Sequence, residues 1–238
     1  KKLAQALIKL GAEIGDRIAT MAWSNIRHYE LYYGVSGIGS VCHTINPRLY
    51  PEQITYIIND AEDKFLFIDL DFIPLVEKIY SSLNNLNTII VLCTKTEMPK
   101  SSSLNNLICY EDLIDVEDGN FEWPQFDEKT ASSLCYTSGT TGNPKGVLYA
   151  HRSTIVHSLA AAAPDNLSVS ARDVVMPVAP MFHANSWGIP YVATMAGAKL
   201  VLPGRHLDGE SVYSLITKES VTLTAAVPTI WLMLFEYL

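Results

Sequence analysis

Short apolar runs alternate with amphipathic helical patterns along most of this chain. Apolar residues at helical spacing separate most of the strand-like runs from one another. Strict alternation of strand and helix favours a parallel, doubly wound sheet with right-handed crossovers. The predicted fold class is therefore α/β with mainly parallel sheets. Strands are expected at residues 17–22, 41–45, 65–68, 88–92, 132–136, 147–150, 173–178, 199–202 and 221–226.

Glycine, proline and capping residues mark where the expected helices begin and end. The opening helical pattern should end at Gly11, and Pro51 suits the first turn of a helix over 51–61. A helix over 183–195 should be bent or delayed by Pro190, because proline lacks the N–H that a helix interior needs. Other helices are expected over 74–83 and after Pro228. N-caps are predicted at Ser24, Ser153 and Asp208.

The alternation lapses between residues 94 and 128, where Ser, Asn, Asp, Glu and Pro dominate and only 107–113 has an ordered apolar pattern. Such a stretch is typical of a surface connection. The chain is accordingly divided into a first α/β portion (1–93), an irregular connection (94–128) and a portion over 129–238 that carries the motifs described below.

Composition excludes several classes of protein. The net charge is −8, which argues against a nucleic-acid surface because such a surface needs clustered Lys and Arg. The four cysteines lack metal-site spacing and read as reduced core thiols of a cytoplasmic protein. The longest uncharged span, 174–198, is interrupted by prolines and glycines, so no transmembrane segment is expected.

A polyanion-binding composition is concentrated in YTSGTTGNPKGV at residues 136–147. Glycines can turn consecutive N–H groups toward one point, hydroxyls add donors, and lysine supplies a compact cation for phosphate. The stretch is not a Walker loop, because Pro144 precedes Lys145 and Gly146 follows it. A flexible surface turn is the alternative, but such turns rarely run so directly into an apolar strand.

This stretch resembles the signature phosphate loop of the adenylate-forming (AMP-binding) superfamily. A second stretch, PMFHANSWGIPY at residues 180–191, resembles the next motif of that superfamily. Its form with Trp187 is most similar to medium- and long-chain fatty acyl-CoA synthetases. The resemblance implies an incomplete N-terminal large domain of the adenylate-forming fold, without the C-terminal domain. Both ends of the chain fall inside helical patterns, so it is expected to be part of a longer protein.

The resemblance also implies roles for individual residues. Thr137, Lys145 and His183 would be the catalytic set, and Thr137 would contact phosphate or Mg2+. Phe182, His183 and Trp187 would face the carboxylic acid substrate. Residues implied to hold the nucleotide are Thr137, Ser138, Gly139, Thr140, Thr141, Gly142, Lys145, Ala184 and Trp187. Loop closure would be a gating step, and the loop glycines give it a physical basis.

Two structural alternatives stay open for the second stretch. His183 could be a core histidine bonded to a carbonyl oxygen. The apolar residues from Trp187 to Met195 could belong to the core, since a stripe at helical spacing is more often core than binding site. The other histidines lack partners at metal-ligand spacing and are expected to be structural.

The implied reaction uses ATP, Mg2+ and CoA. A fatty acid would attack ATP to give acyl-adenylate and pyrophosphate, and CoA would then form the thioester. The fragment by itself is expected to be inactive, because later motifs of the superfamily have no counterpart in it. A homodimer is a family expectation. The alternatives are an aryl- or amino-acid-adenylating relative, or a non-catalytic nucleotide-binding module.

Overall fold

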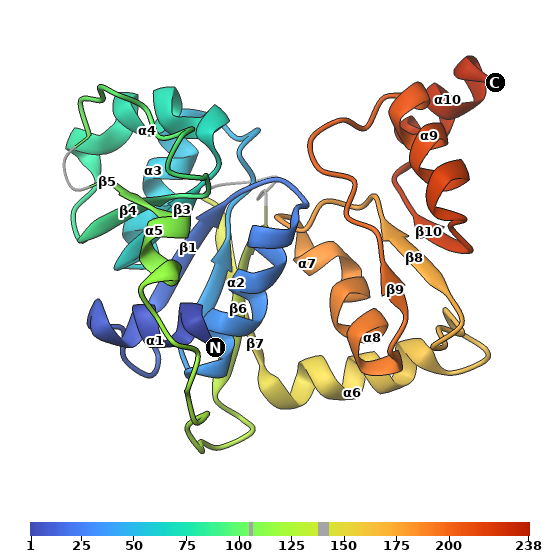
Figure 1. Ribbon diagram of the computed structural model, residues 1–238, viewed down its shortest axis with the longest axis horizontal. Coiled ribbons are helices and arrows are strands. Elements are labelled where there is room, and N and C mark those ends of the chain that lie inside the picture. Colours follow the sequence, from blue (N-terminus) through green and yellow to red (C-terminus); the bar gives the residue numbers. More distant parts are fainter. Residues whose placement is uncertain (105–106, 138–142) are drawn as a thin grey trace. The chain divides into compact units, whose positions relative to one another are not determined.

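A computed structural model describes residues 1–104, 107–137 and 143–238 of the chain (Figure 1). The chain divides into two compact units, each described here by itself. The first unit comprises residues 1–22 and 30–151, and the second comprises residues 23–29 and 152–238. The phosphate-loop stretch therefore belongs to the same unit as residues 30–93, whereas the sequence-based division grouped it with residues 152–238.

The first unit contains a seven-stranded sheet of order β5-β4-β3-β1-β2-β6-β7. Neighbouring strands are parallel except for β6 and β7, which form an antiparallel hairpin at one edge. The mainly parallel α/β fold was thus predicted correctly. The strands are β1 (Arg17–Met21), β2 (Val41–Thr44), β3 (Phe65–Ile68), β4 (Thr88–Val91), β5 (Leu107–Cys109), β6 (Ala131–Thr137) and β7 (Lys145–Ala150).

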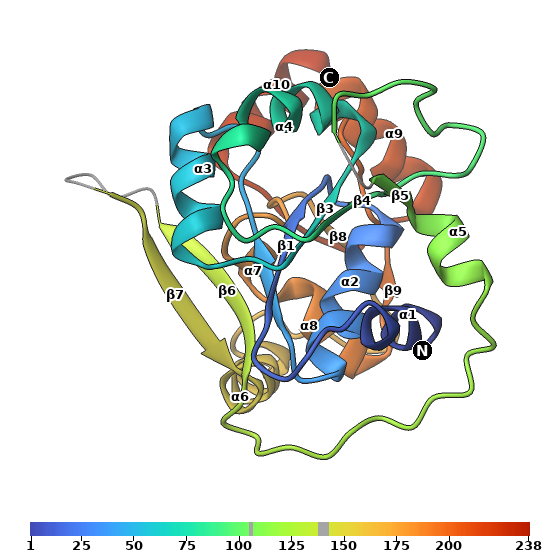
Figure 2. The same ribbon diagram turned by 90° about the vertical axis from the view of Figure 1, so that its left-hand side faces the viewer.

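Helices cover both faces of this sheet, which explains why the inner strand β3 is apolar at every position. All four residues of β3, with sequence FLFI, are buried. Figure 2 shows α3 and α4 on one face and α1 and α5 on the other. The helices are α1 (Lys2–Lys9), residues 30–37 of α2 (Ile26–Gly37), α3 (Pro51–Asp60), α4 (Ile73–Ile79) and α5 (Tyr110–Asp115), with single 3-10 turns at Leu70–Phe72 and Tyr80–Ser82.

Several predicted boundaries are confirmed. Gly11 follows the end of α1 with φ +89°, a conformation in which glycine is not strained. Pro51 begins α3, as expected from its fixed φ. The ordered pattern over 107–113 corresponds to β5 and α5, so the connection adds a strand to the sheet.

Two predicted N-caps are wrong. Asn25, not Ser24, caps α2, because its side chain accepts a hydrogen bond from the His28 N–H at 2.9 Å. Ser24 instead accepts one from the Met181 N–H at 3.2 Å. Ser153 lies inside α6 (His151–Ala162), whose start two residues earlier leaves no capping position for it. In contrast, Asp208 caps α9 as predicted, accepting a hydrogen bond from the Ser211 N–H at 3.0 Å.

The second unit contains a parallel three-stranded sheet of order β10-β8-β9. Its strands are β8 (Val174–Pro177), β9 (Lys199–Leu200) and β10 (Leu223–Ala225). Its helices are residues 152–162 of α6, the short turn α7 (Ala184–Trp187), α8 (Ile189–Ala196), α9 (Gly209–Glu219) and α10 (Pro228–Tyr237).

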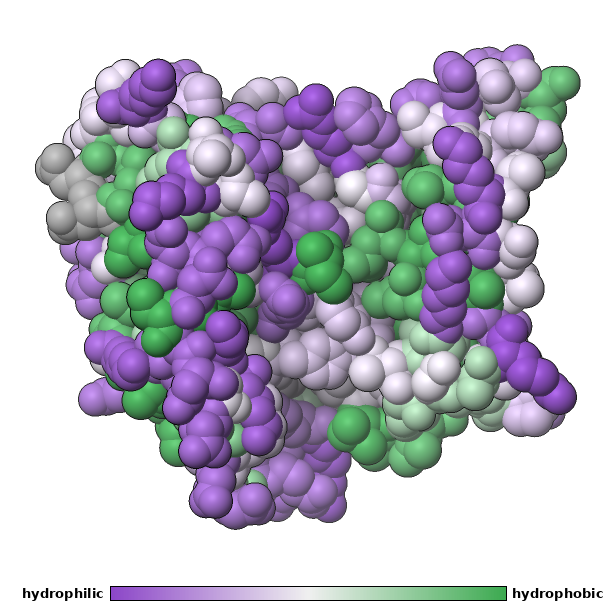
Figure 3. Space-filling view, in the orientation of Figure 1, coloured by the Kyte–Doolittle hydropathy of each residue, from purple (hydrophilic) through white to green (hydrophobic). Residues whose placement is uncertain are grey.

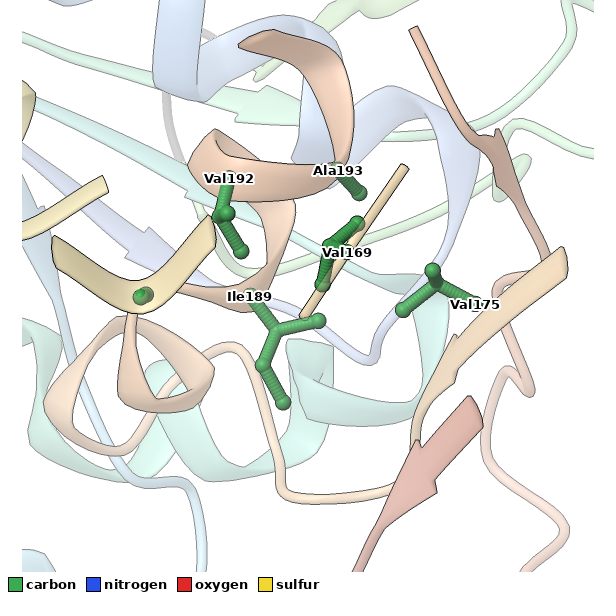
Figure 4. Packing of buried hydrophobic residues seen from close by; sticks show 6 residues of the cluster. Val169, Val175, Ile189, Val192 and Ala193 are labelled. Atoms are coloured by element: carbon green, nitrogen blue, oxygen red, sulfur yellow. The ribbon is translucent and has the colours of Figure 1, made fainter. Parts of the chain in front are cut away.

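Successive residues of β8 belong to two separate hydrophobic clusters. Val175 packs with Ile189 and Val192 of α8 (Figure 4). Met176 packs instead with Val212 of α9 and Leu234 of α10. Because successive side chains of a strand point to opposite faces, one strand anchors helices on both sides of the small sheet.

Helix α6 leaves an unusual amount of apolar surface exposed. Ile155, Val156 and Leu159 are between 55% and 60% exposed, and green patches lie over this helix in Figure 3. Among the described helices, none combines the length and the hydropathy needed to cross a membrane.

Candidate functional site

The phosphate-loop stretch connects the two strands of the antiparallel hairpin. Thr137 ends β6 and Lys145 begins β7, and the two residues lie directly opposite each other. The Thr137 hydroxyl donates to the Lys145 carbonyl oxygen at 3.4 Å, and both residues are exposed. No carboxylate of the described residues pairs with the Lys145 ammonium group. The hairpin mouth therefore presents a cation that can bind an anion, and the Thr137 hydroxyl can donate to the same anion only in place of its long bond to Lys145.

Five of the residues predicted to bind nucleotide lie outside the described residues. Their proposed contacts with phosphate thus stay predictions from the sequence. They are Ser138, Gly139, Thr140, Thr141 and Gly142.

Gly146 has a different role from the one its position in the loop suggested. We expected its backbone freedom to matter, but Gly146 lies within β7 and its φ is outside the left-handed region. It lies opposite Tyr136, and a Cβ there would be 3.2 Å from Tyr136 Cζ and 3.1 Å from Leu134 Cδ1. The missing side chain leaves room for the tyrosine ring on this face of the hairpin.

A buried histidine–carboxyl pair lies behind the Tyr136 ring. The His43 ring centroid is 5.2 Å from that of Tyr136, and His43 Nδ1 lies 2.8 Å from Asp63 Oδ2. Both side chains are fully buried, and burial raises the pKa of Asp63 although His43 and Arg17 oppose the shift. His43 Nε2 and Asp63 Oδ1 have no hydrogen-bond partner within the described chain. His43 is thus buried and bonded to Asp63, and its purely structural role stays a prediction from the sequence.

The second motif places its aromatic and histidine side chains differently. Phe182 is 5% exposed and its ring meets that of Trp23 edge to face, with centroids 6.1 Å apart. His183 is exposed, and its backbone N–H donates to the Pro180 carbonyl oxygen at 3.0 Å. Phe182 is therefore held by the core of the unit, whereas the His183 ring is accessible to a ligand.

The predicted helix over 183–195 is wrong in its first half. Residues 184, 185, 186 and 187 have φ of 44°, 51°, 53° and 55°, and Gly188 has φ of 74°. Each non-glycine residue in this left-handed region costs about 1–2 kcal/mol, and such strain clusters at functional sites. The regular helix α8 begins only at Ile189, with Gly188 as its N-cap and Pro190 in its first turn. The sequence predicted that Pro190 would either bend or delay the helix, and the delay is confirmed.

Buried hydrogen bonds hold this left-handed turn. The Ser186 hydroxyl donates to the Ala179 carbonyl oxygen at 2.5 Å, and the Ser186 N–H donates to the His183 carbonyl oxygen at 2.9 Å. Asn185 and Ser186 are buried, whereas Trp187 is 43% exposed. The turn consequently fixes the backbone on which Ala184 and Trp187 are carried.

The apolar residues from Trp187 to Met195 do not form a single stripe. Ile189 and Val192 are buried in the core, as the core alternative predicted. Trp187 and Met195 are 43% and 40% exposed. Only the exposed members are therefore available to a substrate.

His157 of α6 is a neighbour of the turn that sequence reasoning missed. A Cβ on Gly188 would lie 2.7 Å from both His157 Cε1 and Nδ1, so the ring lies against the glycine backbone. The requirement for glycine at 188 has two causes, the positive φ and the histidine ring. The sequence gives no sign of the second cause, because His157 lies 31 positions earlier.

The predicted site residues belong to two different units, and the structure describes their geometry within each unit. Thr137 and Lys145 lie together in the first unit, and Phe182, His183, Ala184 and Trp187 lie together in the second. The described residues include no group of three His, Cys, Asp or Glu side chains that could hold a metal ion. Mg2+ binds oxygen ligands and usually takes only one or two of them from the protein. The oxygen of the exposed Thr137 hydroxyl is such a ligand, so the described residues fit a magnesium ion that is bound mainly by phosphate groups.

Solved structures match this fold. The anthranilate CoA ligase AuaEII in complex with anthranoyl-AMP has a TM-score of 0.86 at 25% identity, over 97% of this chain and 43% of that chain. The inhibitor-bound N-terminal domain of FACL13 from Mycobacterium tuberculosis has a TM-score of 0.80 at 25% identity. This match covers 96% of this chain and 54% of that chain. The chain thus has the fold of the N-terminal domain of adenylate-forming enzymes, as predicted.

Curated relatives agree with the structural matches. A medium-chain-fatty-acid–CoA ligase of Ectopseudomonas oleovorans is 57% identical over 97% of this chain. A 3-methylmercaptopropionyl-CoA ligase of Ruegeria lacuscaerulensis is 54% identical over 97%, and a long-chain-fatty-acid–CoA ligase of Thermus thermophilus is 45% identical over 100%. The chain spans 42–43% of the length of these relatives. The family model described as AMP-binding enzyme matches residues 1–238, and the chain belongs to this family.

Proposed function

We propose that the full-length protein containing this chain is an ATP-dependent acid:CoA ligase that activates medium- or long-chain fatty acids. The observation that carries the proposal is the hairpin mouth, where Thr137 and Lys145 stand opposite each other with the ammonium group unpaired by any described carboxylate. The 57% identity to a medium-chain-fatty-acid–CoA ligase supports the substrate class.

The first chemical step is the transfer of AMP to the acid. A carboxylate oxygen of the fatty acid attacks the α-phosphorus of ATP, and the bond to the leaving pyrophosphate breaks. The Lys145 ammonium group would neutralise charge that develops on the pyrophosphate, and the Thr137 hydroxyl would donate a hydrogen bond to it in place of the 3.4 Å bond to the Lys145 carbonyl oxygen. Mg2+ bound to the triphosphate would add further neutralisation, with Thr137 as a contact from the protein.

The acid would bind at the second motif. The exposed His183 ring can donate a hydrogen bond to the carboxylate, and the half-exposed Trp187 ring offers apolar surface to the alkyl chain. Each methylene buried there would contribute about 0.8 kcal/mol, so chain length would be read by the depth of burial. In the second step, the CoA thiol sulfur attacks the acyl carbon and AMP leaves.

Exchange of labelled pyrophosphate into ATP tests this proposal on the full-length protein. The panel should contain saturated fatty acids of increasing length, together with 3-methylmercaptopropionate and anthranilate, the acids suggested by the names of relatives. We expect exchange to be greatest with medium or long chains. A preference for anthranilate would overturn the substrate class. Absence of exchange with every acid would overturn the ligase assignment.

A second candidate substrate is 3-methylmercaptopropionate, favoured by 54% identity to the Ruegeria lacuscaerulensis enzyme. This acid is short and carries a thioether, so it would bury less apolar surface than a medium-chain fatty acid. A kcat/KM for it above that for every fatty acid in the panel would favour this candidate.

A further inference from the structure

One flank of the phosphate-loop hairpin is hydrogen-bonded to helix α3. The Tyr136 hydroxyl, just before the hairpin mouth, donates to Asp60 Oδ2 at 2.6 Å. The other oxygen of Asp60 accepts from the Tyr56 hydroxyl at 3.2 Å. The Tyr56 hydroxyl thereby helps to fix the Asp60 carboxylate that accepts from Tyr136. Residues of one turn of α3 therefore hold the end of β6, directly before the loop.

The surroundings of Tyr136 restrict its ring to this position. Gly146 opposite leaves space for the ring, and the His43 ring packs against it with the Asp63 carboxylate fixing the imidazole. Burial, followed by the bond to Asp60, raises the pKa of Tyr136, so the hydroxyl stays protonated and can donate at neutral pH. The bond to Asp60 is charge-assisted, which makes it stronger than a bond between neutral groups.

Side chains alternate between the two faces of the hairpin, and this alternation relates the Tyr136 contact to Thr137 and Lys145. Tyr136 and Gly146 share the hairpin face that meets α3, so their neighbours Thr137 and Lys145 point to the other face. The first four residues of β7 are exposed along this edge strand. Contacts with α3 are thus well placed to limit movement of the hairpin mouth.

We propose that Asp60 and Tyr56 are positioning residues, which hold Tyr136 so that Thr137 and Lys145 are preorganised to bind the phosphates of ATP. This inference rests on the proposed function. A hairpin ordered before the substrate binds avoids the entropy cost of ordering it during the reaction. The contacts should act on ATP and on pyrophosphate release, and not on binding of the acid.

The test compares Tyr136→Phe, Asp60→Asn and the double variant of the full-length protein by pyrophosphate exchange, with ATP and the acid varied separately. Each single variant should lower kcat/KM for ATP about tenfold, as expected for loss of one charge-assisted hydrogen bond, and leave the acid KM unchanged. The double variant should lose little more than Tyr136→Phe alone, because Tyr136→Phe removes the bond and Asp60→Asn removes the charge that strengthens the same bond. Tyr56→Phe should cause a smaller loss of the same kind.

Tyr110→Phe is the matched control. The Tyr110 hydroxyl donates to Glu30 at 2.6 Å in the same unit, and neither residue belongs to the hairpin. This variant should lose stability without a change in the ATP parameters. The inference is overturned if Tyr136→Phe and Asp60→Asn stay within twofold of wild type for ATP, or weaken ATP and acid equally as general destabilisation would.

Hydrogen exchange provides a readout that is independent of activity. Amides of residues 146–149 should exchange faster in Tyr136→Phe than in Tyr110→Phe if α3 holds the hairpin. Wild-type protein without ATP-dependent exchange of pyrophosphate would reject the proposed function. Unchanged protection of these amides would instead reject the anchoring by α3.

Discussion

Lys145 carries the ammonium group at the hairpin mouth, exposed and opposite Thr137. Because this side chain is exposed, Lys145→Ala should leave the fold intact. It should lower the rate of adenylate formation about 100-fold, since it removes a group that stabilises charge on the leaving pyrophosphate. Pyrophosphate exchange and direct binding of the acid, both measured on the full-length protein, give the two quantities to compare.

Lys100→Ala is the control for this substitution, because Lys100 is also exposed and is not part of the hairpin. It should leave adenylate formation unchanged. Equal slowing by the two substitutions would show that net positive charge, not the position of Lys145, supports the reaction.

At the scale of single residues, the chemical character of a site was easier to predict from the sequence than the contacts between its residues. Hydroxyl and lysine side chains in one short stretch were enough to predict an anion site at Thr137 and Lys145. The partnership of Tyr136 with Asp60 was not predictable, because the two residues are 76 positions apart and only the fold brings them together. Likewise, Gly146 looks like a flexible loop residue until the ring opposite it is known.

Among the elements, the left-handed turn before α8 gives a prediction for Gly188. Gly188→Ala should destabilise the protein by about 1–2 kcal/mol from the positive φ alone. A further loss should come from the His157 ring, which a Cβ would approach to 2.7 Å. Chemical denaturation of the full-length protein measures the total, and the acid KM reports whether His183 and Trp187 have moved.

Gly197→Ala isolates the two contributions. Gly197 has φ of +72°, close to that of Gly188, but a Cβ there would meet only the Ala171 methyl group at a comfortable 3.8 Å. Gly188→Ala should therefore cost more than Gly197→Ala, and adding His157→Ala should reduce the difference. Equal costs at the two glycines would contradict the proposed contact.

Whether a segment is a helix or a strand was predictable from the local sequence pattern where the segment is buried in the core. Buried runs such as FLFI in β3 could only be strands between two layers of helices. The turn over 184–187 was predicted to be helical, because Ala-Asn-Ser-Trp contains no glycine that would indicate a left-handed backbone. Its conformation depends on the hydrogen bond from Ser186 to the Ala179 carbonyl oxygen, which only the folded chain brings together.

For the molecule as a whole, the pH dependence of stability sums over all titratable groups, and His28 contributes a separable part. Burial lowers the pKa of His28 from 6.5 to about 4, although the bond to the Trp23 carbonyl oxygen opposes the shift. Between these pH values the unfolded chain binds a proton at this residue and the folded chain does not. Stability must therefore fall as pH decreases through this window.

His28→Gln should remove this contribution while keeping a neutral polar side chain at the position. From about pH 7.5 to about pH 5, wild-type protein should lose about 2 kcal/mol of stability more than the variant does. Denaturation curves of the full-length proteins at the two pH values give this difference directly. His206→Gln is the control, because it makes the same substitution at an exposed histidine and not at a buried one. If the curves of wild type and His28→Gln shift equally on acidification, His28 is not held in its neutral form by the fold, and the acid sensitivity of the molecule must come from other groups.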